Sequence, residues 1–276
     1  MNRILSVIKQ TKKPIFGMIH IKPTPGSPKF QPINTISNIK SDAIDQAKLL
    51  LDCEVDGLVI ENMFDRPYNL PEEQNPIVIS LLSIIGSSVR ELFPRVPIGL
   101  QILSACNRDA LAVAAAADLD FIRCEGFVYG HIADEGWIQS SAASLLRYRQ
   151  QIYSDHIWIM ADVKKKHSSH SITADVSLLE TIQGAEFFLA DSAIVTGNFT
   201  GVAPDLKELK LLTNDRKFNI PLVLGSGMSS DNIGSYFDLA DIFIVGSDFK
   251  LDGHWQNELD KKRIIKFMSN VKKMRN

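Results

Sequence analysis

Short apolar segments recur along the chain at intervals that fit strands separated by helices. Each segment is almost free of polar residues, which is the pattern of a parallel strand buried on both faces. Eight segments fit this description: residues 15–20, 57–60, 98–103, 121–124, 157–161, 193–195, 222–224 and 242–245. The spacing between them leaves room for a helix after each strand.

The intervening segments favour helices. Residues 41–53 repeat apolar side chains at three- and four-residue steps, the stripe of an amphipathic helix. Residues suited to a helix cap or a first turn precede four further predicted helices: Asn107, Thr173, Pro204 and Ser229. Eight strands alternating with helices over about 250 residues predict a single (β/α)8 barrel domain, residues 1–276. The alternative is a doubly wound open sheet, but no G-x-G-x-x-G motif follows the first predicted strand.

The beginning of the chain is basic. Residues 1–41 contain Lys and Arg but no Asp or Glu, a composition shared with organellar transit peptides. The first predicted strand begins at Ile15, so we expect residues 1–14 to form a short amphipathic lead-in that covers one end of the fold. Import into an organelle is the alternative.

Composition excludes several classes of protein. The 30 Lys and Arg residues against 32 Asp and Glu give a net charge of −2, without the basic footprint of a nucleic-acid binder. Three cysteines without metal-ligand spacing argue against a disulfide framework and favour a reducing compartment, so we expect a cytoplasmic protein. No apolar run reaches the roughly 18 residues of a membrane span. A homo-oligomer is compatible with apolar outer helices, although no segment specifies its interface.

Candidate catalytic residues stand where the predicted strands end, which is where a (β/α)8 barrel places its active site. His20 and Glu61 follow the first two strands, and Asp162 and Lys164 end the fifth. Period-two alternation would put Asp162 and Lys164 on one face, where each would shift the pKa of the other and act as base or acid. A structural ion pair is the alternative for these two residues.

Further polar residues at the same strand ends are predicted to bind substrate: Asn62, Gln101, Arg123, His167, Thr196 and His254. Metal-dependent hydrolysis is a competing interpretation, because several of the side chains are possible zinc ligands. These are His20, Glu61, Asp162, His167 and His170. No H-x-H or H-E-x-x-H spacing supports a metal, so no cofactor is predicted.

Glycine-rich turns follow the last two predicted strands. They are Gly225-Ser226-Gly227 and Gly246-Ser247. Glycine lets backbone N–H groups approach an anion, and the loops after strands seven and eight are the recurrent phosphate site of this fold. Plain turn chemistry is the alternative. Asp248 places a negative charge beside this predicted phosphate site, which Lys250 would offset.

The chain resembles the BtpA family. Residues 16–28, Phe-Gly-Met-Ile-His-Ile-Lys-Pro-Thr-Pro-Gly-Ser-Pro, are similar to its opening signature. Further similar stretches follow in the same order, at residues 60–62, 120–123, 161–167, 193–197, 224–227 and 244–247. The resemblance implies a barrel of the ribulose-phosphate-binding type. Thr24 and residues 99–106 depart from the usual pattern, so the chain resembles the branch outside cyanobacteria.

Two functions of different class follow. The first is a soluble enzyme that binds or converts a phosphorylated sugar or nucleotide-like metabolite at the C-terminal face of the barrel. The second is a non-catalytic assembly or regulatory factor, since the resemblance implies a role in photosystem I biogenesis for the cyanobacterial members of the family.

Overall fold

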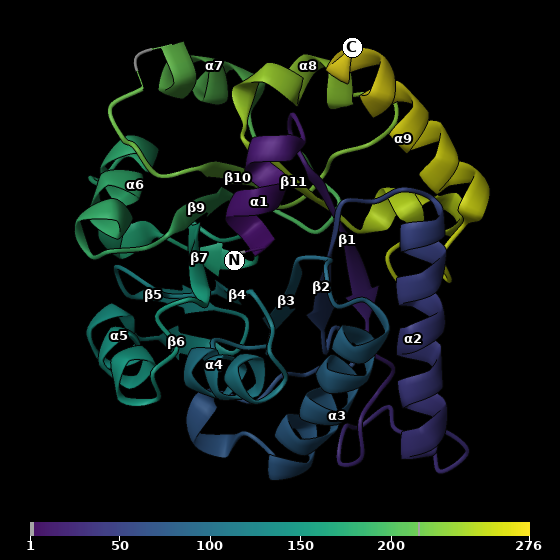
Figure 1. The fold of residues 1–276 in the computed structure, drawn as a ribbon. Helices are drawn as coiled ribbons and strands as arrows, with labels where there is room; N and C mark the ends of the chain where they lie inside the picture. The colour runs from purple at the N-terminus through teal and green to yellow at the C-terminus, as the bar shows by residue number, and fades with distance from the viewer. Residues whose placement is uncertain (1–2, 215) are drawn as a thin grey trace.

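Eight parallel strands close into a barrel in the computed structural model, which describes residues 3–214 and 216–276 (Figure 1). The order around the barrel is β1-β11-β10-β9-β7-β4-β3-β2. The strands are β1 (Ile15–His20), β2 (Gly57–Glu61), β3 (Ile98–Gln101), β4 (Phe121–Cys124), β7 (Trp158–Val163), β9 (Ser192–Val195), β10 (Leu222–Leu224) and β11 (Ile242–Val245). Each predicted strand overlaps one of these, so the predicted (β/α)8 barrel is confirmed.

Helices surround the barrel (Figure 1). They are α2 (Ile36–Asp52), α3 (Pro76–Leu92), α4 (Asn107–Ala116), α5 (Ala142–Gln151), α6 (Leu178–Phe187), α7 (Leu206–Asn214), α8 (Ile233–Tyr236) and α9 (Lys261–Arg275). Short 3-10 turns occur at η1 (Pro71–Glu73), η2 (Ser171–Thr173), η3 (Phe237–Leu239), η4 (Ser247–Phe249) and η5 (Leu251–Gly253). In α2 the apolar stripe faces inward, where Ala43, Ala47 and Leu50 are fully buried. The helices therefore cover the outer side of the strands with apolar surface.

Two of the predicted helix caps are wrong because the side chains have other partners. Asn107 lies inside α4, and its side-chain amide bonds the backbone of Glu125. Asn107 Nδ2 donates to the Glu125 carbonyl at 2.6 Å, and Asn107 Oδ1 accepts from the Glu125 N–H at 3.2 Å. Thr173 belongs to the short turn η2. The cap of α6 is Ser177, which forms a reciprocal capping box with Glu180.

The starts of α7 and α8 are also displaced from their predicted positions. Pro204 precedes α7, and the Asp205 carboxylate accepts the first free N–H groups, those of Lys207 and Glu208, each at 2.8 Å. Asn232 occupies the cap position of α8, three residues beyond Ser229. The local sequence thus predicted that both helices exist but not the residue at which each one begins.

A small antiparallel sheet lies on the loops beyond β4 and β7, and the apolar pattern did not predict it. It consists of β5 (His131–Ala133), β6 (Gly136–Ile138) and β8 (Ser168–Ser169), in the order β6-β5-β8. Its strands are two or three residues long, too short to show a period. The sheet ties the loop after β4 to the loop after β7.

The base of the barrel is closed by helix α1 (Arg3–Gln10), which Figure 1 shows in front of the strands. Ile4 is fully buried and packs with the apolar side chains inside the barrel, including Phe16 and Phe121. Arg3 holds the helix in place by bonding Asp118 at 2.7 Å and Asp120 at 3.0 Å. Part of the expected lead-in therefore belongs to the core, while residues 1–2 lie outside the described residues.

We predict that Ile4→Ala lowers the free energy of unfolding by about 2 kcal/mol or more, because it leaves a cavity at the end of the core. Ile265→Ala in α9 is the matched control, since this side chain is 47% exposed. Guanidinium unfolding curves measure both variants. Equal losses would show that α1 does not contribute to the barrel core.

Candidate functional site

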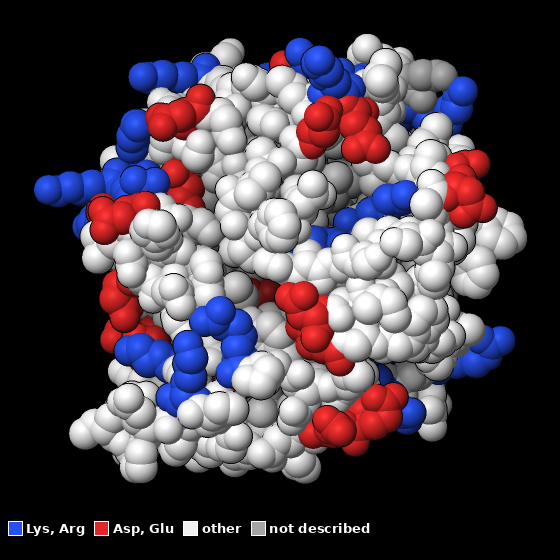
Figure 2. Space-filling view, turned by 180° about the vertical axis from the view of Figure 1, so that it is seen from behind, with Lys and Arg blue, Asp and Glu red and all other residues white. Residues whose placement is uncertain are grey.

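Two adjoining cavities open at the C-terminal ends of the strands. The first encloses about 670 Å³ and the second about 1010 Å³. Both are lined by the same five residues: Glu61, Met63, Arg123, Lys166 and Thr200. Figure 2, seen from the side opposite α1, shows basic side chains inside a hollow and acidic side chains nearby. The shared residues make the two cavities one site.

A buried ion pair spans this site from β4 to β7. Arg123 Nε donates to Asp162 Oδ2 at 2.9 Å, and Arg123 Nη2 donates to Asp162 Oδ1 at 3.1 Å. Burial raises the pKa of Asp162, and Arg123 opposes that shift. A Cβ added at Gly225 would lie 3.5 Å from Nη2, so the guanidinium stands beside the first glycine turn. Asp162 therefore fixes the direction of a cation.

Lys164 is not the partner of Asp162. Strand β7 ends at Val163, and Lys164 has a left-handed φ of 47°, so the alternation along the strand stops before it. It lines a neighbouring groove beside α6 and α7, together with Leu178 and Glu208, and lines neither of the two cavities. The expectation that it shares a face with Asp162 is wrong. The next two lysines are the ones that reach the site.

Lys166 lines both cavities and is a cation without a fixed partner. Its ammonium makes no hydrogen bond or ion pair with any described residue, whereas its backbone N–H donates to Thr196 Oγ1 at 3.2 Å. Burial, with Arg123 second, lowers the pKa of Lys166 to about 8. An appreciable fraction of this side chain is therefore an uncharged amine near neutral pH.

Glu61 and His20 form the acid–base part of the site. His20 Nε2 lies 3.7 Å from Glu61 Oε2. Burial raises the pKa of Glu61, while burial and Lys250 lower the pKa of His20 to about 3. His20 Nδ1 faces the Trp255 carbonyl at 3.4 Å, which assigns its proton to Nδ1 and leaves Nε2 as an acceptor. A neutral imidazole thus stands beside a carboxyl group whose pKa is raised by burial.

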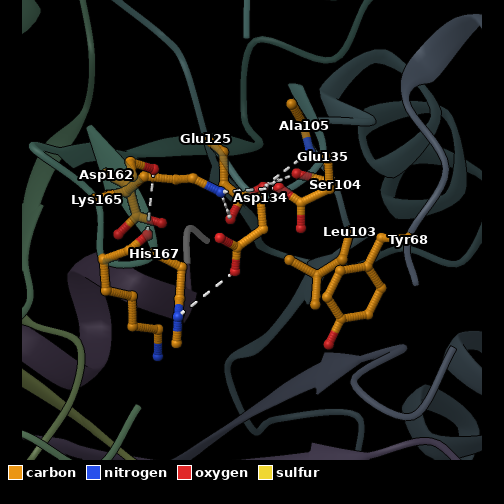
Figure 3. Close-up of polar contacts among 12 residues, drawn as sticks. Tyr68, Leu103, Ser104, Ala105, Glu125, Asp134, Glu135, Asp162, Lys165 and His167 are labelled. Carbon is orange, nitrogen blue, oxygen red and sulfur yellow. Dashed lines mark hydrogen bonds and ion pairs between the residues drawn. The ribbon is translucent and has the colours of Figure 1, made fainter. Parts of the chain in front are cut away.

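Lys165 differs from its neighbour because acidic residues surround it (Figure 3). Its ammonium donates to Glu125 at 3.1 Å and lies 3.9 Å from Glu135. Glu125 also accepts from Ser104 Oγ at 3.1 Å and from the Ala105 N–H at 2.8 Å. Burial alone would lower the pKa of Lys165, but the two carboxylates raise it. This cluster holds the loop after β3 in place.

The glycine turns line the first cavity as predicted, on one side of Arg123. The backbone N–H groups of Ser226 and Gly227 donate to no atom of the described residues. Gly227 has a φ of +74°, and a Cβ there would lie 2.1 Å from Ala203 N, so only glycine fits. Ser226 Oγ accepts from the Gly197 N–H at 3.3 Å and donates to the Val202 carbonyl at 3.2 Å. The Ser226 hydroxyl thus fixes the loop, and its N–H remains available.

Asp248 does not oppose an anion at this corner. Its carboxylate accepts from Arg263 at 2.7 Å and from Ser230 N and Oγ at 3.1 and 3.2 Å. Arg263, and not Lys250 as expected, neutralises this charge. Lys250 reaches Gln46 Oε1 at 3.4 Å instead.

Two more predicted substrate-binding residues line the second cavity. Gln101 is buried there, and its Oε1 has no hydrogen-bond partner among the described residues. His167 stands at the rim, with Nε2 2.9 Å from Thr200 Oγ1 and Nδ1 3.8 Å from Asp134 (Figure 3). Both are placed to contact a ligand in the larger cavity.

The remaining predicted residues lie outside the two cavities. Asn62 accepts from the Leu103 N–H at 2.8 Å and donates to Asp65 at 3.2 Å, so it braces a loop. Thr196 holds the backbone of Lys166, and His254 is exposed outside the cavities. Trp255 lines the second cavity in place of His254.

The side chains proposed as metal ligands do not form one group. Asp162 is bonded to Arg123 and His167 to Thr200, while only His20 and Glu61 are near each other. Within residues 3–214 and 216–276, no three His, Cys, Asp or Glu side chains are arranged to hold a metal ion.

Comparison with known proteins agrees with the sequence resemblance. The BtpA family profile matches residues 11–273. A Caenorhabditis elegans protein described as uncharacterized and mitochondrial is 43% identical over 274 residues, covering 97% of this chain and 96% of its own. The photosystem I biogenesis protein BtpA of Synechocystis is 33% identical over 260 residues, covering 94% of this chain and 88% of its own.

Solved structures share the fold at low sequence identity. Thiamine phosphate pyrophosphorylase from Pyrococcus furiosus has a TM-score of 0.57 and 15% identity, covering 97% of this chain and all of its own. Phosphoribosyl anthranilate isomerase from Thermus thermophilus has a TM-score of 0.56 and 11% identity, covering 95% of this chain and all of its own. In the described part of the chain, no helix is long and apolar enough to cross a membrane.

We predict that Asp162→Asn lowers the free energy of unfolding by about 3–5 kcal/mol, because it leaves the buried Arg123 guanidinium without its counter-charge. The matched control is Asp231→Asn, which breaks a 3.0 Å pair with Lys266 at the surface. It is expected to cost less than about 1 kcal/mol. Chemical unfolding of both variants is the measurement. A small loss at Asp162 would contradict its role in holding Arg123.

We also predict that His20 makes the fold sensitive to acid. Its pKa of about 3 lies below the ordinary 6.5, so between these values the unfolded chain binds a proton that the folded chain does not. Stability is therefore full above pH 6.5 and falls as pH decreases, with His20 contributing about 2–3 kcal/mol of that fall by pH 4.5. His20→Gln should show a correspondingly smaller fall between pH 7 and 4.5. His254→Gln, at an exposed site, should keep the parent profile.

Proposed function

We propose that this chain, which belongs to the BtpA family, binds a phosphorylated small molecule at the barrel mouth and performs acid–base chemistry on it. The observation that carries the proposal is the pair of unpaired N–H groups at Ser226 and Gly227 beside the Arg123 guanidinium. The ligand class is a phosphorylated sugar or a nucleotide-like metabolite.

The first cavity suits the phosphate. Its backbone donors belong to the turn after β10, and Gly246 and Ser247 after β11 face them across the corner. Loops in these two positions bind phosphate in many barrels of this type, and backbone N–H groups with a nearby guanidinium form short, strong bonds to phosphate oxygens. The names of the two barrels compared above also refer to phosphorylated compounds. This half of the site would fix the orientation of the ligand.

The second cavity suits the rest of the ligand. Gln101 Oε1, unpartnered and buried, can accept from a ligand hydroxyl. Glu61 lies between the two cavities with His20 beside it, so it can give or take a proton at the carbon nearest the phosphate end. Asp162, bonded twice to Arg123, positions that cation rather than transferring protons itself.

The cysteines and helix α1 bear on the compartment in which the protein works. Cys53, Cys106 and Cys124 are free and buried, which suits a reducing environment. Helix α1 is part of the barrel base through Ile4. We propose that the protein works in the cytoplasm or, by analogy with its C. elegans relative, in mitochondria, with α1 part of the folded barrel.

Binding of ribose 5-phosphate and of inorganic phosphate tests the proposal, because a ligand of the native state raises the melting temperature. Ser247→Asp places a negative charge in the corner and should weaken both ligands at least about tenfold, which is 1.4 kcal/mol. Ser235→Asp is the matched control, because it makes the same change at an exposed position of α8. It should bind like the parent.

Calorimetric titration would supply the affinities. The absence of any effect of either ligand on the parent protein would overturn the proposal and favour a non-catalytic assembly role, as in the name of the Synechocystis relative. Equal binding by the two Asp variants would place the phosphate elsewhere.

A further inference from the structure

We propose that Lys166 is a nucleophile, whose amine attacks an aldehyde or ketone carbon of the phosphorylated ligand and forms an imine. This inference rests on the proposed function, because the phosphate is what would bring the carbonyl group to Lys166. The substrate class is thereby narrowed to phosphorylated carbonyl compounds, such as the open-chain forms of sugar phosphates.

The position of Lys166 is the first argument. It lines both cavities, so a ligand that has its phosphate at Ser226 and Gly227 and extends into the larger cavity would lie along Lys166. The backbone on either side is fixed to the loop after β9. Lys166 N donates to Thr196 Oγ1, and His167 N donates to the Asn198 carbonyl, both at 3.2 Å. The lysine thus projects from an anchored segment.

The surroundings of Lys166 favour the uncharged amine. No carboxylate of the described residues is within ion-pair distance of its ammonium, whereas Lys165 next to it is held by Glu125 and Glu135. Burial lowers the pKa of Lys166 most and the Arg123 guanidinium lowers it next, while Glu61, Asp162 and Glu125 oppose the shift from beyond ion-pair distance. Both oxygens of Asp162 are already bonded to Arg123. Of two adjacent lysines, one is a structural cation held by carboxylates and the other has no ion-pair partner among the described residues.

Glu61, which lines both cavities together with Lys166, can donate the proton that the reaction needs. The Lys166 nitrogen lone pair adds to the carbonyl carbon, and the carbonyl oxygen takes up a proton from the Glu61 carboxyl group. The Glu61 carboxylate takes a proton from the new C–N ammonium and passes it to the carbinolamine hydroxyl, which departs as water as the C=N bond forms. The nitrogen keeps its remaining proton, so the product is an iminium ion, which acidifies the neighbouring carbon. The Glu61 carboxylate can then remove a proton there.

Pyridoxal 5′-phosphate is a suitable probe, because it carries both an aldehyde and a phosphate. Incubation with the full-length protein, reduction with borohydride and peptide mapping by mass spectrometry would locate any amine that forms an imine. We expect modification of Lys166 to exceed that of Lys164 at least about tenfold, because Lys166 lines both cavities and Lys164 lines neither. Inorganic phosphate should protect Lys166 and leave Lys164 unaffected.

Two variants complete the experiment. Lys166→Arg keeps the positive charge but cannot be trapped, so the major adduct should disappear, while Lys164→Arg should label like the parent. The peptide map of the parent protein decides the matter even if Lys166→Arg fails to fold. Labelling spread evenly over surface lysines, or concentrated on Lys165, would overturn the proposal.

The outcomes separate this inference from the proposed function. Labelling of Lys166 without protection by phosphate would support the nucleophile and contradict the phosphate site. Binding of phosphate at the Ser247 corner with no label on Lys166 would support the site and contradict the nucleophile.

Discussion

The chemistry of the barrel mouth depends on one buried ion pair. An arginine without access to water needs a counter-charge, and Asp162 supplies it through two bonds to Arg123. Because both oxygens are used, the guanidinium is fixed in direction, beside Gly225 and near Lys166. The guanidinium is therefore held at the wall of the first cavity, and it adds to burial in lowering the pKa of Lys166, although Asp162 opposes that shift.

A second constraint comes from the closed barrel. Its interior is filled by apolar side chains from alternate strand positions and is closed at the base by Ile4 of α1. Polar groups are left only at the opposite end, where the strands finish. The loops that follow β4, β7, β9 and β10 then bind one another, through Ser226 to Gly197 and Val202 and through the small sheet β6-β5-β8. The rigidity of the site thus comes from contacts between loops as well as from the strands.

The barrel could be predicted because strands that are buried on both faces appear in the sequence as short apolar runs, and eight such runs alternate with predicted helices. The sequence also located the candidate site at the strand ends, where two cavities open. Lys164 was misplaced because period-two alternation was carried past Val163, the last residue of the strand, onto a residue with a left-handed φ. Three lysines in a row have identical local chemistry, so only the turn decides which of them reach the cavities. Asn107 and Asn62 were misassigned because their partners are distant in sequence.

The acidic hairpin formed by β5 and β6 gives the mouth an uneven charge. Asp134 and Glu135 lie on the side of the larger cavity, whereas the Arg123 guanidinium faces the glycine turns on the other side. Glu135 lies near Lys165, whereas Asp134 has no Lys or Arg partner among the described residues, so the hairpin side of the opening repels an anion more than the glycine side does. A molecule that carries its negative charge at one end would be turned by this field as it approaches and would enter with that end toward the glycines. Orientation would then begin before the first hydrogen bond forms, and the neutral end would arrive last, beneath the hairpin.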